Sequence, residues 1–107
     1  MKSFENIKLA INSTIKDALK IIDAGGMQIA LVLDDDNKLV GTITDGDIRR
    51  GILKGLTLSD SIESIIFRTP TVCSVNDTKE DILKIAVAKK LYQIPIVDLD
   101  GVLVGID

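Results

Sequence analysis

Residues 39–47, with the sequence LVGTITDGD, decide the fold of this chain. Because the turn residues at 34–37 come directly before it, the segment 38–42 is expected to return as a strand, and the Thr-x-x-Asp pattern over 44–47 predicts that a helix begins near Asp45. The letters LVG return at Leu103–Gly105, 64 residues later. A strand that carries the same sequence in each half of the chain indicates an internal repeat.

Two further matches support the repeat. Gln28–Val32 (QIALV) matches Gln93–Val97 (QIPIV) at an offset of 65 residues, and residues 17–21 share four identities with 81–85 at an offset of 64. Three matches in the same order at nearly one offset are not expected by chance. The chain therefore consists of two related halves, each of which places a helix before a strand hairpin.

Each half is expected to form a β-α-β-β-α unit, so that the fold class is α/β (α+β). In the first half we expect helices over 15–24 and 45–55, strands over 28–33 and 38–42, and a linker helix around 59–66. In the second half we expect strands over 72–75, 94–97 and 102–105, a helix that begins after 76–78, and no final helix. The expected boundaries are 1–66 for the first repeat, including an N-terminal lead-in and the linker helix, and 67–107 for the second.

Composition excludes several classes of function. The chain has 107 residues, with 46% hydrophobic and 3% aromatic residues and a net charge of −3, which disfavours a nucleic-acid platform. It has no histidine and one cysteine, so that Cys/His zinc sites, disulfide frameworks and Ser-His or Cys-His nucleophile pairs are excluded. The longest apolar run, residues 29–33, is far too short to span a membrane. We expect a cytoplasmic protein that contacts neither nucleic acid nor membrane.

The repeated blocks resemble a tandem pair of CBS domains, also called a Bateman module, over roughly 9–107. The resemblance implies two repeats related by a pseudo-two-fold axis, with clefts for adenosyl ligands between them. It also implies that the module regulates an attached enzyme, channel or transporter, and that it forms a homodimer. The expected regulatory ligand is AMP or ATP, and no obligatory cofactor is expected.

Residues 44–50 (TDGDIRR) look like the CBS pairs of carbohydrate-phosphate enzymes. One such group lies at the N-terminus of sugar-phosphate nucleotidyltransferases, and another at the C-terminus of arabinose-5-phosphate isomerases. Because the first repeat begins close to Met1, we expect an N-terminal module, with a nucleotidyltransferase catalytic domain beyond Asp107.

The block Gly41–Asp47 resembles the ribose-phosphate motif of the family. A carboxylate accepts hydrogen bonds from both hydroxyls of a ribose, which is the role expected for Asp47. The helix N-terminus and the hydroxyl of Thr44 are expected to hold a phosphate, assisted by Arg49 or Arg50. The alternative is that Thr44 and Asp47 form only a capping box, which needs no ligand.

The resemblance places the other wall of the same cleft in the second repeat. Thr71 and Val72 would approach the base, and Tyr92, Ile94 and Pro95 would form the wall beside it. The alternative for Val72 and Ile94 is a place in the apolar core, and Pro95 is also suited to open a strand. One complete site is expected, because Asp107 aligns with an isoleucine of the first repeat and not with Asp47.

Three functions are therefore compared. The first is a regulatory module that binds an adenine nucleotide and controls an attached catalytic domain. The second is a structural dimerisation module without a ligand. The third, catalysis by this chain itself, is not expected, because neither a histidine nor a metal cluster accompanies the carboxylates and lysines. The acidic turn over 34–37 lacks the glycine and glutamate of a calcium loop, so that a solvated hairpin turn is expected there.

Overall fold

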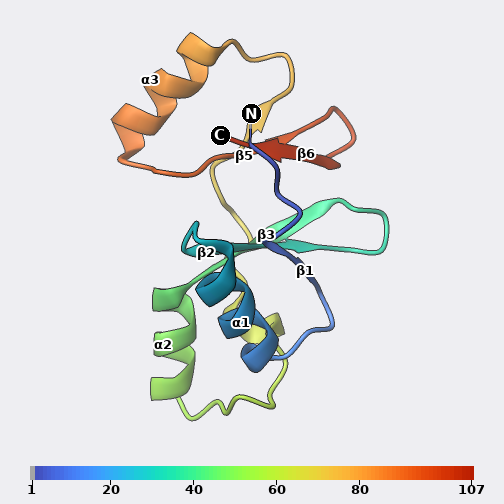
Figure 1. Cartoon of the computed structure of the whole chain (residues 1–107), viewed down its shortest axis with the longest axis vertical. Coiled ribbons are helices and arrows are strands. Elements are labelled where there is room, and N and C mark those ends of the chain that lie inside the picture. The colour runs from blue at the N-terminus through green and yellow to red at the C-terminus, as the bar shows by residue number, and fades with distance from the viewer. Residues whose placement is uncertain (1) are drawn as a thin grey trace.

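The computed structural model describes residues 2–107 and shows two small sheets, with α1 and α2 at one end of the molecule and α3 at the other (Figure 1). The first repeat contains β1 (Lys8–Ala10), α1 (Ile15–Gly25), β2 (Ile29–Leu33), β3 (Leu39–Thr44) and α2 (Asp45–Leu53), followed by the 3-10 turn η1 (Glu63–Ile65). The second repeat contains β4 (Cys73–Ser74), α3 (Lys79–Lys89), β5 (Pro95–Val97) and β6 (Leu103–Ile106). The predicted α+β class is confirmed, and β6 is the last element in the described part of the chain.

The two sheets have the same topology. In each sheet the middle strand, β2 or β5, pairs in parallel with the strand before the helix and antiparallel with the strand of the hairpin. The last four residues of β2 are all buried, which explains its unbroken apolar sequence. The helix connection between parallel strands and the tight acidic turn of the hairpin together define a β-α-β-β unit.

A pair of reciprocal hydrogen bonds joins the two hairpin turns around a pseudo-two-fold axis. The amide of Leu39 donates to the carbonyl of Gly101 at 3.0 Å, and the amide of Leu103 donates to the carbonyl of Asn37 at 3.0 Å. Beside these bonds, side chains from both repeats share one apolar cluster, with Ile7, Leu31, Leu33, Leu103 and Ile106 buried. The halves thus fold against each other through both backbone and core.

The segments that precede each repeat cross to the opposite sheet. Lys2 forms an antiparallel bridge with Ile106 of β6, and Phe67 forms one with Thr42 of β3. Phe67 and Thr42 exchange both of their backbone hydrogen bonds, at 3.0 and 2.9 Å. The linker between the repeats is therefore held against the edge of the first sheet by this one bridge, which places it beside the start of α2.

The structural offset between the repeats is 64 residues at the helix caps and in the hairpin pairings, which corrects the offset of 65 read from the two Gln-Ile blocks. Pro95 lies opposite Ile106 in the second hairpin, as Leu31 lies opposite Thr42 in the first. The position equivalent to Pro95 is therefore Leu31. Because a shift of one residue in a strand moves every side chain to the other face, hydrogen-bond register and not local identity defines equivalence here.

The predicted linker helix over 59–66 is wrong apart from one 3-10 turn, η1. The backbone there bonds to the start of α1: the amide of Ile15 donates to Asp60, and the amide of Ile62 donates to Ser13. Ile62 and Ile66 are buried in the core of the first repeat. These long-range contacts hold the segment in an irregular path across the first repeat.

All three helices begin with the same capping box. Thr14, Thr44 and Thr78 each accept a hydrogen bond from the backbone of an aspartate three residues later, and that aspartate's side chain accepts one from the threonine amide. Such a cap satisfies two of the otherwise unpaired amides of a helix N-terminus. The capping interpretation of Thr44 is therefore correct as local structure, whatever else the residue does.

The cap of α1 makes stability depend on pH. The hydrogen bonds from Thr14 hold the pKa of Asp17 below its ordinary value of 3.8. Because the pKa is lowered, the unfolded chain binds this proton more tightly than the folded chain does. The ionised carboxylate of Asp17 therefore contributes its full stability at pH values above the ordinary pKa. This stability is lost as the pH falls through the lowered pKa. We expect Asp17→Asn to reduce the slope of unfolding free energy against pH below about pH 4. Urea titrations between pH 3 and 6 measure this slope, and an unchanged slope contradicts the assignment.

Candidate functional site

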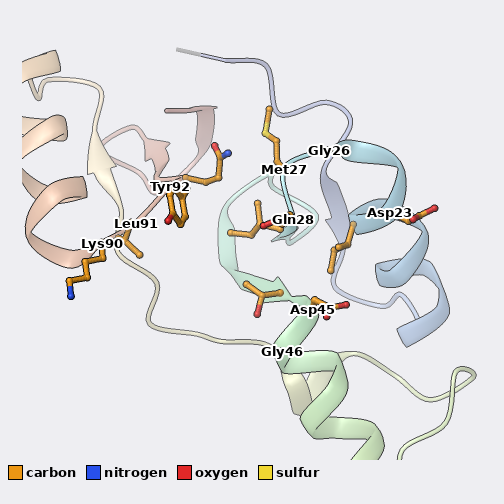
Figure 2. Close-up of a pocket in the computed structure, with 13 residues that line it drawn as sticks. Asp23, Gly26, Met27, Gln28, Asp45, Gly46, Lys90, Leu91 and Tyr92 are labelled. Atoms are coloured by element: carbon orange, nitrogen blue, oxygen red, sulfur yellow. The ribbon is translucent and has the colours of Figure 1, made fainter.

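A cleft of about 710 Å³ lies between the two repeats (Figure 2). One wall belongs to the first repeat and is made by the end of α1, by residues 26–29 and by the junction of β3 with α2 at Thr44–Gly46. The other wall is the segment Lys90–Gln93, which connects α3 to β5. The pseudo-two-fold packing of the halves thus leaves a space large enough for a small organic ligand.

The N-terminus of α2 opens onto this cleft. Asp45 and Gly46, the first two residues of the helix, both line it, together with the N-cap residue Thr44. The free amides of the first turn and the helix dipole create a positive electrostatic potential at this point. An anionic group of a ligand could accept hydrogen bonds from these amides, beside the carboxylate of Asp45, which pairs with Arg49.

Asp47 already has partners for both of its carboxylate oxygens. Oδ2 accepts from the amide of Thr44 at 2.9 Å and from its hydroxyl at 3.0 Å, and Oδ1 lies 2.8 Å from a guanidinium nitrogen of Arg50. Its side chain is 17% exposed. It lines a neighbouring hollow of about 430 Å³, with Ile66 and Phe67, and not the larger cleft. To hold a ribose, this carboxylate would have to accept hydroxyl bonds beside its present ones.

The two arginines that the sequence placed near a phosphate are both held by acids of their own helix. Arg49 pairs with Asp45 at 2.7 Å, and Arg50 pairs with Asp47 at 2.8 Å. Neither arginine lines the cleft. The i,i+4 and i,i+3 spacings of these pairs are visible in the sequence, so that both pairings were accessible to prediction.

Of the five residues predicted from the second repeat, one lines the cleft and four do not. Tyr92 lines the cleft opposite Thr44 and is 93% exposed. Ile94 is buried with Cys73 and Ile96 in the core of the second repeat, and Pro95 opens β5. The remaining two lie at the linker and do not line the cleft: Thr71, whose hydroxyl is 3.5 Å from Nζ of Lys89, and Val72.

Several cleft residues were missed by sequence reasoning. Gln28 lines the cleft with a φ of 62°, a left-handed conformation that is uncommon for a residue other than glycine. Gln93 lines the opposite wall, and its Oε1 is buried with no hydrogen-bond partner within the described residues. Both glutamines belong to the Gln-Ile blocks that revealed the internal repeat, but the sequence analysis did not assign them to the cleft. Asp23 and Asp45 also line the cleft, as does Lys90, which the sequence offered as a contact for phosphates.

The acidic residues of the two hairpin turns are explained by hydrogen bonds within the turns. Oδ1 of Asp34 and Oδ1 of Asp98 each accept two backbone amides within their own hairpin turns, at 2.9 and 3.0 Å. Over residues 2–107, no group of three or more potential ligands is placed to hold a metal ion.

Burial raises the pKa of the Cys73 thiol, with help from the nearby carboxylate of Asp77, which disfavours the reactive thiolate. No helix between residues 2 and 107 combines the length and the apolarity needed to cross a bilayer.

The family follows from a comparison of the whole chain with known families. The sequence model described as "CBS domain" matches it twice, over residues 3–54 and 62–106. The chain belongs to the CBS domain family. It contains two CBS domains in tandem, as the repeat predicted.

The curated relatives of this chain are much longer than the CBS pair. "Uncharacterized protein RP505" of Rickettsia prowazekii is 33% identical over 107 residues, which are 99% of this chain and 33% of that protein. "Arabinose 5-phosphate isomerase GutQ" of Escherichia coli K12 is 26% identical over 98 residues, which are 92% of this chain and 30% of the isomerase. The chain thus spans about a third of the length of the curated relatives that it matches.

Solved structures share the fold at lower identity. A structure described as CBSX2 in complex with AMP has a TM-score of 0.83 and 23% identity, and the match covers 100% of this chain and 84% of that one. The CBS domain protein PAE2072 of Pyrobaculum aerophilum, also complexed with AMP, has a TM-score of 0.79 and 18% identity, with 100% and 86% covered. These likenesses establish the arrangement of the CBS pair.

Proposed function

We propose that this CBS pair is a regulatory module that binds an adenine nucleotide in the cleft between its repeats and controls an attached catalytic domain. The observation that carries the proposal is the cleft itself, in which the N-terminus of α2 faces the segment Lys90–Gln93 of the other repeat. Two structural relatives of this fold were solved with AMP, which supports the ligand class.

In this proposal each part of the nucleotide meets a suitable chemical group. The phosphate lies against the first amides of α2 and the hydroxyl of Thr44. The ribose reaches toward the adjoining hollow, where Asp47 accepts its hydroxyls beside the cap. The base packs between the apolar side chains of Ile29 and Leu91 and the ring of Tyr92, because flat rings gain most from apolar and aromatic walls.

The attached enzyme is proposed to act on a sugar phosphate. The resemblance of residues 44–50 allowed a nucleotidyltransferase or an arabinose-5-phosphate isomerase. The relatives named as arabinose 5-phosphate isomerases match 92% of the CBS pair, and they favour the isomerase of these two. Ligand binding to the CBS pair would then change the activity of that catalytic domain.

Ligand-induced stabilisation tests the proposal directly. At a free concentration of 100 times Kd, a ligand that binds only the folded state adds about 2.7 kcal/mol to the free energy of unfolding. For a domain of this size the melting temperature should rise on the order of 10 °C. Thermal melts with millimolar AMP, ADP, ATP and GMP measure the effect. If no nucleotide shifts the melt and sedimentation shows a nucleotide-independent dimer, the CBS pair is a structural dimerisation module instead.

A further inference from the structure

Helix α3 presents an apolar face to solvent. Leu83 and Val87, one turn apart on this helix, are 63% and 71% exposed. No residue of α3 is buried, and within residues 2–107 no other helix lies beside it, whereas α1 and α2 lie together at the opposite end (Figure 1). Because a short helix gains most of its stability from packing of its apolar side chains, this helix of 11 residues is expected to have a cover.

A groove of about 530 Å³ lies against the same face. Its lining includes Leu83, Ile94, and Leu91 and Tyr92 of the segment that follows α3. Tyr92 is 93% exposed. Single exposed apolar side chains are ordinary on protein surfaces, but several of them beside one groove are typical of an interaction site.

The equivalent positions of α1 are covered or polar. At the offset of 64, Leu83 corresponds to Leu19, which packs against the cluster that contains Ile48 of α2. Val87 corresponds to Asp23, which is exposed. Valine forms helices less well than lysine, glutamate or glutamine, because its branched side chain loses rotamer freedom. Helix stability therefore does not account for an exposed valine in α3.

The charges of α3 suit a second copy of the same helix in antiparallel orientation. The first turn contains Glu80 and Asp81 with one lysine, whereas Lys89 and Lys90 lie at the other end. An antiparallel copy places each acidic end beside a basic end and opposes the two helix dipoles. A two-fold axis midway between Leu83 and Val87 also brings each of these side chains against the other one in the second copy.

We propose that this face of α3 is a two-fold interface, at which a second copy of the chain packs its own α3 in antiparallel orientation. The contact is closed by the two-fold axis, so that the assembly stops at a dimer. Because one helix and the groove beside it form a small interface, we expect a dissociation constant of about 10 to 100 μM. The proposal does not depend on whether the cleft binds a nucleotide.

Sedimentation equilibrium at protein concentrations from about 5 μM to about 1 mM tests the proposal. We expect the measured mass to rise from that of one chain toward twice that mass. Leu83→Glu should weaken the dimer about 50-fold, because the symmetry places the new charge in the apolar contact twice. Leu99→Glu is the matched control: Leu99 is 86% exposed in the β5–β6 turn, so that the same change should leave the dimer unaltered. Circular dichroism of both variants shows whether each keeps its fold.

Glu80→Lys tests the antiparallel orientation. The pair that Glu80 forms with Lys84 is long, at 3.7 Å, and exposed, so that Glu80 remains available to a second copy. The new lysine would face the basic end of the other α3 at both ends of the contact. The dimer should weaken about five-fold at low salt and less at about 0.5 M salt. Glu63→Lys, which changes an exposed acid of η1 in the first repeat, should have no effect.

Each result supports or overturns the proposal. A chain that stays monomeric at about 1 mM contradicts it, and so does a dimer that Leu83→Glu weakens no more than Leu99→Glu does. A dimer that Glu80→Lys strengthens or leaves unchanged shows that the helices are not antiparallel. None of these results bears on nucleotide binding, which the thermal melts measure separately.

Discussion

Replacing Gly41 with alanine is expected to lower the free energy of unfolding by about 3 kcal/mol, because it forces the linker at Phe67 away from β3, and the two segments cannot separate without losing hydrogen bonds. A Cβ atom on Gly41 would overlap the carbonyl oxygen of Phe67 and would lie 2.6 Å from Cγ2 of Ile66. The next residue, Thr42, exchanges both backbone hydrogen bonds with Phe67. Relief of the clash therefore requires the linker at Phe67 to move away from β3 and to give up these two hydrogen bonds.

The control for this prediction is Gly46, a glycine that has room for a Cβ atom. A Cβ atom on Gly46 would come no closer than 3.2 Å to a neighbour, and that neighbour is the end of the flexible Arg50 side chain. Since Gly46 lies within the first turn of α2, alanine there should be neutral or should stabilise by up to about 1 kcal/mol. Urea denaturation of both variants measures the difference. Equal stability of Gly41→Ala and the natural protein would show that the linker is not held against β3 at this point.

The helices and hairpins could be predicted from the sequence because their signals are local. Each helix starts at a Thr-x-x-Asp cap, each hairpin turn is acidic, and α1 ends at Gly26 with a left-handed φ of 74°. These signals depend on hydrogen bonds between residues at most four apart in the chain. The internal repeat then predicted that the chain forms two similar units, which pack together around a shared apolar cluster.

The register and the linker could not be predicted, because both depend on distant partners. The blocks at Gln28 and Gln93 match best at an offset of 65, yet the hairpin hydrogen bonds place the equivalent positions 64 apart. Ile62 and Ile66 have a spacing that suits a helix, but backbone bonds to residues near the start of α1 hold the segment in another conformation. In both cases a tertiary contact outweighs the local pattern.

Within the candidate site, the junction of β3 and α2 was identified from sequence, and the facing wall was identified only in part. The structure brings Thr44 and Tyr92 to one cleft, and it directs Asp47 to the adjoining hollow. The role of Asp47 is thus the prediction that most needs a test, because the same carboxylate caps α2 in the structure.

Asp47→Ala is expected to weaken nucleotide binding by about 100-fold and to lower the free energy of unfolding by only about 1 kcal/mol. The loss of binding follows if the carboxylate holds both ribose hydroxyls in the partly buried space beside α2, where charge-assisted hydrogen bonds are strong. The loss of stability follows from the capping box alone. Calorimetric titration with AMP and urea denaturation measure the two effects separately.

The chain provides a matched control in α3, whose capping box is formed by Thr78 and Asp81 in the same geometry. Asp81 lines neither the cleft nor the adjoining hollow. Asp81→Ala should therefore cost a similar stability of about 1 kcal/mol and leave AMP affinity unchanged. If Asp47→Ala also binds AMP normally, Asp47 is a helix cap alone. A loss of binding confined to Asp47→Ala would establish that a cap shared by all three helices has gained a second role at α2, because only that cap lies where the two repeats meet.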